Sequence, residues 1–425
     1  MEILTQLLWG RILPVLLILT ALVCLVRLRG RPVRGLHTVL RDTYGSLLRK
    51  PDAEQRRIFA SALAATMGTG NLAGTALALK AGGPGAIFWM WISALLGTEL
   101  VCAENLLSDR YRSENRNGTV IGGALGYLRT GFRSRLPVTV FAVCCVLASL
   151  GMGNLVQSST LAQSAASLGM PLPAAGILTA ALLGILLLGG ISRVRRFADL
   201  LMPLLCGLYL LGCTVHLCRH AAALPAAFSR ILREAFGFRA AGGGFTAALL
   251  LRSLPEGLKR GIFSNEAGLG SSGLLHMDAK SGAQWKWAAA EVFADTVICC
   301  TMTALVILTA PGLSLRDTAP SALLLSAFSS GLGRAAAGFL ALSMMLFAFA
   351  TIIGWYPCGL TAFRFLFGSS ADSIYMMLCI IAAFAGALGD PALLWSFCDL
   401  CNGCMALPNL LGLLRLRREI RPENL

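Results

Sequence analysis

Two glycine-rich stretches interrupt apolar segments of the sequence and decide how the chain folds. The first reads Met67-Gly68-Thr69-Gly70-Asn71-Leu72-Ala73-Gly74, and the second reads Gly261-Ile262-Phe263-Ser264-Asn265-Glu266-Ala267-Gly268-Leu269-Gly270-Ser271-Ser272. Glycine and small polar residues weaken a helix in mid-membrane, where free backbone groups are tolerated only if they are buried or line a cavity. The stretches therefore predict two broken helices around a buried site.

The composition indicates a membrane protein. Of the 425 residues, 56% are hydrophobic and only 13% are charged, and the mean hydropathy is +0.71. A soluble domain of this length needs more charge to cover its surface. The net charge of +15 could indicate nucleic-acid binding. The basic residues, however, lie between apolar stretches, as in loops that face an anionic cytoplasmic leaflet.

Apolar stretches long enough to cross the membrane as helices recur along the chain, and we predict eleven of them. They lie near residues 12–27, 58–79, 85–108, 137–165, 174–191, 199–218, 244–272, 288–310, 335–356, 373–389 and 391–414. With the N-terminus outside and the C-terminus in the cytoplasm, most loop Lys and Arg fall on the cytoplasmic side. This arrangement predicts a multi-pass protein of the cell membrane.

The two breaks lie five predicted spans apart, so each opens a group of five. Interrupted helices at matching positions of two halves indicate the binding site of an inverted-repeat transporter. The predicted parts are an N-terminal helix and cytoplasmic segment (1–57), a first repeat (58–218), an extracytoplasmic loop (219–243), a second repeat (244–414) and a cytoplasmic tail (415–425). Close helix packing is the alternative explanation of the glycines. The intramembrane Glu266 favours a functional site, because a carboxylate there is costly.

Longer motifs strongly resemble the alanine/glycine:cation symporter family. They are Gly68 to Gly74 followed by Gly82-Gly83-Pro84-Gly85-Ala86-Ile87-Phe88-Trp89-Met90-Trp91, then Gly153-Asn154-Leu155-Val156-Gln157, Arg260 to Ser271, Asp295-Thr296, Ile353-Gly354-Trp355, Asn402-Gly403 and Met405-Ala406-Leu407-Pro408-Asn409. The resemblance covers nearly the whole chain. It implies a LeuT-type five-plus-five inverted repeat preceded by one extra helix. It also implies sodium-coupled uptake of small neutral amino acids, chiefly alanine and glycine.

Three positions depart from the family pattern. Ala350 stands where the family usually has serine, Ser159 where it usually has asparagine, and Tyr356-Pro357-Cys358-Gly359 where it tends to have Tyr-Tyr-Gly-Glu. The first change removes a hydroxyl near the expected cation site, and the second reshapes the pocket. Proton coupling or another small amino acid therefore remains an alternative on the same fold.

The proposed substrate is a zwitterion, so both of its charges need partners once it leaves water. A restarting half-helix presents free N–H groups and a positive dipole end. We therefore assign the carboxylate to the backbone at Thr69, Gly70 and Asn71, with the Thr69 hydroxyl assisting. The ammonium is assigned to carbonyls at Phe263 and Ser264 and to the side chain of Gln157. Phe263 and Trp355 are expected to cap the pocket.

The coupling ion needs oxygen ligands, because sodium is a hard cation. The carbonyls of Ala64 and Ala65 and the hydroxyl of Thr351 are the candidates. No other metal and no cofactor is expected.

The remaining candidates are structural or acidic. We assign Gly68, Gly74, Asn265, Glu266 and Gly268 to the hinges, with Asn265 and Glu266 ordering the broken backbone rather than ligating the ion. Asp295 is expected to pair with a hydroxyl or with a freed N–H. Glu99 and Glu104 are expected to snorkel or to pair with Arg110.

Other classes of protein find little support. Cys398, Cys401 and Cys404 have a spacing typical of iron–sulfur ligation, which keeps a membrane redox protein as a remote alternative. No companion cysteine follows them, and buried small side chains explain them better. The sequence has no phosphate-binding loop and no nucleophile elbow. We therefore predict a transporter and not an enzyme, with an amino acid, sodium and lipid as partners, no nucleic acid, and an open oligomeric state.

Overall fold

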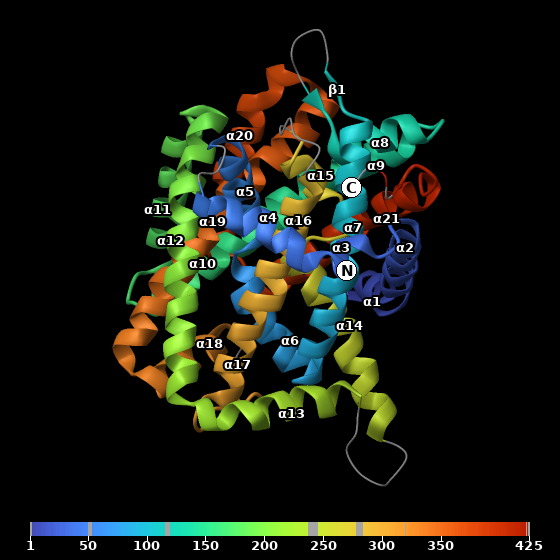
Figure 1. The fold of residues 1–425 in the computed structure, drawn as a ribbon. Helices are drawn as coiled ribbons and strands as arrows, with labels where there is room; N and C mark the ends of the chain where they lie inside the picture. The colour runs from blue at the N-terminus through green and yellow to red at the C-terminus, as the bar shows by residue number, and fades with distance from the viewer. Residues whose placement is uncertain are drawn as a thin grey trace.

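The protein is helical almost throughout. A computed structural model describes residues 2–49, 53–114, 120–236, 245–277, 284–318, 320–421 and 423 (Figure 1). Within these ranges the only sheet is a short antiparallel pair of β1 (Ser113–Glu114) and β2 (Val120–Ile121). The predicted all-α class is confirmed.

Eight helices in the described part of the chain are long and apolar enough to cross a membrane. They are Ile3–Arg27, Gly85–Arg110, Leu136–Ala166, Gly190–Arg219, Gln284–Thr309, Ala335–Phe367, Ser369–Leu388 and Pro391–Arg415. Each overlaps one of the predicted spans. The protein is therefore a multi-pass membrane protein.

The other three predicted spans are helical but fall short of the same measure. Two of them contain the breaks: α5 (Ala53–Thr66) with α6 (Thr75–Gly82), and α14 (Phe245–Asn265) with α15 (Ser271–Leu275). The third is α11 (Leu172–Leu187), which has 16 residues, whereas a straight crossing takes about 20. The count of eleven crossings stays a prediction.

The remaining elements complete the chain. In the first half they are α1 (Glu2–Leu7), η1 (Leu8–Ile12), α2 (Leu13–Arg27), α3 (Arg31–Arg34), α4 (Leu36–Arg49), η2 (Gly70–Gly74), α7 (Gly85–Arg110), α8 (Gly123–Gly131), α9 (Leu136–Leu150), η3 (Gly151–Leu155), α10 (Val156–Ala166) and α12 (Gly190–Arg219). In the second half they are η4 (Ala221–Ala223), α13 (Leu224–Ala235), α16 (Gln284–Val292), η5 (Phe293–Cys300), α17 (Thr301–Thr309), α18 (Pro320–Leu332), α19 (Arg334–Phe367), η6 (Ser369–Ala371), α20 (Asp372–Leu388) and α21 (Pro391–Arg415).

Helix α13 lies inside the segment predicted as an extracytoplasmic loop. In Figure 1 it runs crosswise along the lower end of the molecule, below α6, α17 and α18. It buries Ala227, Ile231 and Ala235, which are four residues apart, and exposes Phe228 and Leu232. A 12-residue amphipathic helix is too short for a membrane-length window to detect. Helix α18 was not predicted for the same reason, since it has 13 residues.

The helices that carry the breaks lie in the interior. Helix α14 packs against α7, and α5 packs against α12 and α19. The end of α2 contacts the C-terminal segment. The Arg27 guanidinium donates to the carbonyl of Arg417 at 2.8 Å and to that of Arg418 at 2.9 Å.

The cysteine-rich end of the chain is ordinary helix. Cys398, Cys401 and Cys404 all lie in α21, and the first two are buried. Within the described residues, no group of three or more His, Cys, Asp or Glu side chains is placed to hold a metal ion. The iron–sulfur alternative therefore has no ligand set in this part of the chain.

Candidate functional site

The first break follows directly from one side chain. The Met67 N–H still donates to the Leu63 carbonyl at 2.7 Å, but the next N–H, of Gly68, donates to Asn71 Oδ1 at 3.0 Å. That N–H would otherwise continue the helix to the Ala64 carbonyl, four residues back. The chain then restarts as the π-helical segment η2. Asn71 therefore replaces a helical bond, and the Ala64 carbonyl loses its helical donor.

The second break is made by the backbone itself. Helix α14 ends at Asn265, and Glu266, Gly268 and Gly270 have φ angles of 57°, 86° and 84° before α15 begins. Positive φ is free for glycine but costly for glutamate. The Asn265 Oδ1 atom accepts a bond from the Ala267 N–H at 3.0 Å and supports the turn.

The two breaks are in contact. A Cβ atom at Gly70 would lie 3.2 Å from Ser264 Cα and 3.4 Å from Phe263 Cδ1. Glycine at this position allows the close approach without displacing Ser264 or the Phe263 ring. The structure thus brings together the predicted carboxylate side and the predicted ammonium side.

A buried carboxylate links the breaks. Asp295 lies in the π-helical segment η5 and accepts from Asn71 Nδ2 on Oδ1 at 2.5 Å. Its other oxygen, Oδ2, accepts from the hydroxyls of Ser264 at 2.6 Å and Thr296 at 2.8 Å. Thr296 also accepts from Asn265 Nδ2 at 3.1 Å. All three partners of the fully buried carboxylate are uncharged. The expected pairing of Asp295 with a hydroxyl is confirmed.

Thr69 and Gln157 are joined although they lie far apart in the sequence. The Thr69 hydroxyl donates to Gln157 Oε1 at 2.8 Å, and both side chains are 1% exposed. Gln157 Nε2 in turn donates to the carbonyl of Met152, in the π-helical segment η3, at 2.9 Å. π-Helical turns inside α-helices occur frequently at functional sites.

The predicted cation ligands lie beside the first break. A Cβ atom at Gly68 would lie 1.9 Å from Thr351 Oγ1, and one at Gly354 would lie 2.6 Å from the carbonyl carbon of Ala64 and 2.4 Å from the nitrogen of Ala65. The Thr351 hydroxyl donates to the Phe347 carbonyl at 3.1 Å, so its oxygen is left to accept. Helix α19 therefore places that oxygen at the end of α5.

Phe263 and Trp355, which were expected to cap the pocket together, have different partners in the structure. Phe263 stacks with Trp395 of α21 at a ring separation of 4.7 Å, and the Arg260 guanidinium lies 5.0 Å from the Trp395 ring. Trp355 instead donates through Nε1 to Glu266 Oε1 at 2.7 Å and is 1% exposed. The sequence did not single out Trp395, because nothing before the fold places it beside Phe263.

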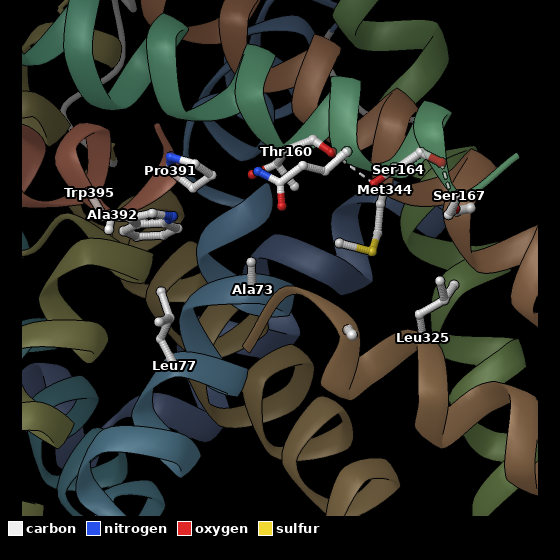
Figure 2. Close-up of a pocket in the computed structure, with 13 residues that line it drawn as sticks. Ala73, Leu77, Thr160, Ser164, Ser167, Leu325, Met344, Pro391, Ala392 and Trp395 are labelled. Atoms are coloured by element: carbon white, nitrogen blue, oxygen red, sulfur yellow. Dashed lines mark hydrogen bonds between the residues drawn. The ribbon is translucent and has the colours of Figure 1, made fainter. Parts of the chain in front are cut away.

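A cavity of about 390 Å³ lies one helical turn from the Thr69–Gln157 bond; we name it the α10 cavity. Its lining residues include Ala73, one turn after Thr69, and Thr160, one turn after Gln157. Figure 2 shows Thr160, Ser164 and Ser167 on the α10 wall, with Ala73 and Leu77 opposite and Trp395 at one end. Gly74 follows Ala73, and a Cβ atom there would lie 3.8 Å from the Thr69 carbonyl oxygen.

The expectation for Glu104 is wrong. This carboxylate is fully buried and accepts from the Gly270 N–H at 3.2 Å and from Asn409 Nδ2 at 2.7 Å. Asn409 Nδ2 also donates to the Gly268 carbonyl at 2.9 Å. Arg110 pairs with Glu419 at 2.7 Å instead. Glu99 is also fully buried, so neither acid reaches the aqueous interface.

These features define a class of protein. A multi-pass helical protein whose two broken helices meet around buried polar groups is a membrane transporter, and its site binds a solute rather than catalysing a reaction. The sequence profile described as the sodium:alanine symporter family matches residues 1–423. The chain belongs to this family.

Curated relatives match over almost the whole chain. The sodium/alanine symporter AgcS of Methanococcus maripaludis is 33% identical, over 98% of this chain and 94% of its own length. An uncharacterized transporter of Haemophilus influenzae is 34% identical, over 98% of this chain and 92% of its own. The probable sodium/glutamine symporter GlnT of Bacillus subtilis is 32% identical, over 98% and 87%. The chain is therefore an amino-acid/cation symporter by family.

Proposed function

We propose that this chain imports small neutral amino acids, chiefly alanine and glycine, with sodium as the coupling ion. The family and the relative named for sodium and alanine support the substrate and the ion. The same proposal includes eleven crossings of the cell membrane and a LeuT-type five-plus-five repeat after one extra N-terminal helix. It places the N-terminus outside and the C-terminus in the cytoplasm.

The contact between the two breaks carries this proposal. Gly70 lies against Ser264, and Asn71 and Ser264 bind the same carboxylate, Asp295. A solute bound at Thr69 and Gly70 therefore lies within reach of the second break. A change at one break can reach the other through Asp295.

The Thr69–Gln157 hydrogen bond supports the position of the substrate. Thr69 supplies a donor, which a carboxylate needs, and Gln157 Oε1 supplies an acceptor, which an ammonium needs. An amino acid that enters between them replaces this one bond with two charge-assisted bonds, which are stronger. Phe263 then closes the pocket together with Trp395, against which it stacks.

Two places beside the substrate suit a cation. One is formed by the Ala64 and Ala65 carbonyls and Thr351 Oγ1, where the helix has lost a donor and the hydroxyl oxygen is left to accept. The other is Asp295, since a buried carboxylate with uncharged partners favours a cation or a proton beside it. Ala350, next to Thr351, contributes no side-chain oxygen to the first of these two cation sites.

Uptake by proteoliposomes tests the proposal. Labelled alanine should accumulate under an inward sodium gradient and should leave when the gradient is dissipated. Gln157→Leu should abolish uptake, whereas Gln6→Leu, the same change on the exposed first helix, should not. Uptake that is independent of both the sodium and the proton gradient would contradict the proposal of cation-coupled transport.

The alternative keeps the fold and changes the ion or the amino acid. Ser159 accepts a bond from Gln163 Nε2 at 3.1 Å near the substrate pocket, and one relative is named for glutamine. Competition of unlabelled alanine, glycine, serine and glutamine against labelled alanine separates the substrates. Uptake driven by a proton gradient at zero sodium would replace sodium by protons.

A further inference from the structure

The α10 cavity has two chemically different walls. None of its lining residues is charged. The polar ones, Thr160, Gln163, Ser164 and Ser167, all come from α10 or its end, whereas η2, α6 and α18 contribute only apolar side chains. The proposed function assigns no role to this polar wall.

The hydroxyl protons of that wall are used in hydrogen bonds to the backbone of α10. Thr160 donates to the Val156 carbonyl at 3.0 Å, Ser164 to the Thr160 carbonyl at 2.8 Å, and Ser167 to the Ser164 carbonyl at 2.7 Å. A hydroxyl has one proton and two lone pairs, so each oxygen keeps lone pairs once its proton is used. The wall therefore presents acceptors.

Gln163 adds a further acceptor. Its Nε2 donates to Ser159 Oγ at 3.1 Å, which leaves Oε1 to accept. The indole of Trp395 is at the end of the cavity away from Ser164 and Ser167 (Figure 2). The end that holds the two serines is thus rich in acceptors.

The helix dipole at the serine end of the cavity also favours a cation. Helix α10 ends at Ala166, so its negative dipole end lies beside Ser164 and Ser167. Asp390, the residue before the lining residue Pro391, caps α21 and accepts from the Ala392 N–H at 2.8 Å, so its carboxylate offsets the positive end of that helix. The C-terminal end of α10 therefore favours positive charge beside the two serines.

We propose that the α10 cavity is a second subsite that binds a monovalent cationic group, either Na⁺ or the ammonium of the amino acid. The cavity binds this group one helical turn from the Thr69–Gln157 bond, before the group moves to the central site. This order of binding rests on the proposed function, in which the substrate and sodium are imported. A cavity of about 390 Å³ also holds several waters, each of about 30 Å³. The group therefore keeps part of its hydration.

Direct binding to the purified full-length protein tests the subsite. Thermal stabilisation is titrated with NaCl and, separately, with ethylammonium chloride, with choline chloride holding the ionic strength constant. Gln163→Lys places a fixed cation in the cavity and should raise the midpoint of binding about tenfold or more. Gln163→Glu should lower it, and Ser164→Ala, which removes an acceptor without changing charge, should raise it by a smaller factor.

The controls are the same charge changes at Gln6, an exposed residue of α1. Gln6→Lys and Gln6→Glu should leave both midpoints unchanged. A shift for NaCl alone assigns the subsite to sodium, and a shift for ethylammonium alone assigns it to the ammonium of the substrate. Midpoints unchanged for both salts in folded Gln163→Lys and Ser164→Ala would overturn the proposal. Because the measurement is binding, a failure of alanine transport would not affect it.

Discussion

The two helix breaks interrupt their helices by different means. The first leaves two residues, Met67 and Gly68, outside the helices and satisfies the turned N–H with the side chain of Asn71. The second leaves residues 266–270 outside and turns the backbone at three positive φ angles. The first break is thus held by a side chain and the second by left-handed backbone.

Glycine consequently has two roles in this protein. Gly68 and Gly70 have ordinary backbone angles, but a Cβ atom there would meet Thr351 or Ser264. Gly268 and Gly270 are needed for conformation, since both have positive φ. We therefore expect the first break to be a tightly packed cradle for the substrate and the second to be the hinge.

Filling the space at the first break should have the largest effect. Gly70→Val adds a Cβ and two Cγ atoms. The Cβ alone would lie 3.2 Å from Ser264 Cα and 3.4 Å from Phe263 Cδ1, so the larger side chain must displace both residues. Alanine uptake should fall about 100-fold or more, because displacement of binding groups by an ångström costs that much. Gly207→Val is the control, since nothing lies within 4 Å of a Cβ there. If both variants fold and transport equally well, the first break is not the cradle.

Removing the charge that links the breaks should have the next largest effect. Asp295→Asn keeps the shape but loses the carboxylate that binds Asn71, Ser264 and Thr296. The sodium concentration for half-maximal uptake should rise about tenfold, because a full charge beside a cation is replaced by a dipole. The exposed Asp317→Asn should leave this value unchanged. An unaltered sodium dependence in Asp295→Asn would remove Asp295 from the cation site.

Much of this could be predicted from the sequence, for identifiable reasons. Long apolar runs and two polar interruptions are local features, so they indicated the helical class and the positions of both breaks. The breaks at Gly68 and Glu266 are where the glycines predicted them. The roles of the site residues remain predictions.

What the sequence missed depends on tertiary packing. Trp395 lies 132 positions after Phe263, and no local pattern joins them. Glu104 was expected near Arg110 because they are close in sequence, yet the fold turns Glu104 towards Gly270 and Asn409. A buried acid finds partners among whatever helices pack against it, and a single sequence does not show that packing.

The second break should respond to the bond between Trp355 and Glu266. Trp355→Phe removes the donor at 2.7 Å and leaves a buried carboxylate oxygen without it. The loss should cost about 1–3 kcal/mol of unfolding free energy, together with some packing. Glu266→Gln keeps an acceptor at the same place and should cost less. Denaturation of both variants in detergent measures the difference, and an equal loss in the two would show that this hydrogen bond does not support the hinge.

A pH dependence at the far side of the second break should be the smallest effect. His276 follows α15 and lies within 3.2 Å of Glu291 Oε2 and 3.1 Å of Gln284 Oε1. Burial opposes protonation, but the negative charge of Glu291 outweighs it and holds the pKa of His276 above its usual value. A raised folded pKa stabilises the fold fully below the unfolded pKa of about 6.5, and this contribution is lost as the pH rises through the folded value. The Tm should therefore fall from pH 6 towards alkaline pH more in the native protein than in His276→Gln. Identical pH profiles for the two proteins would show that the charge of His276 does not stabilise the contact between the end of α15 and α16.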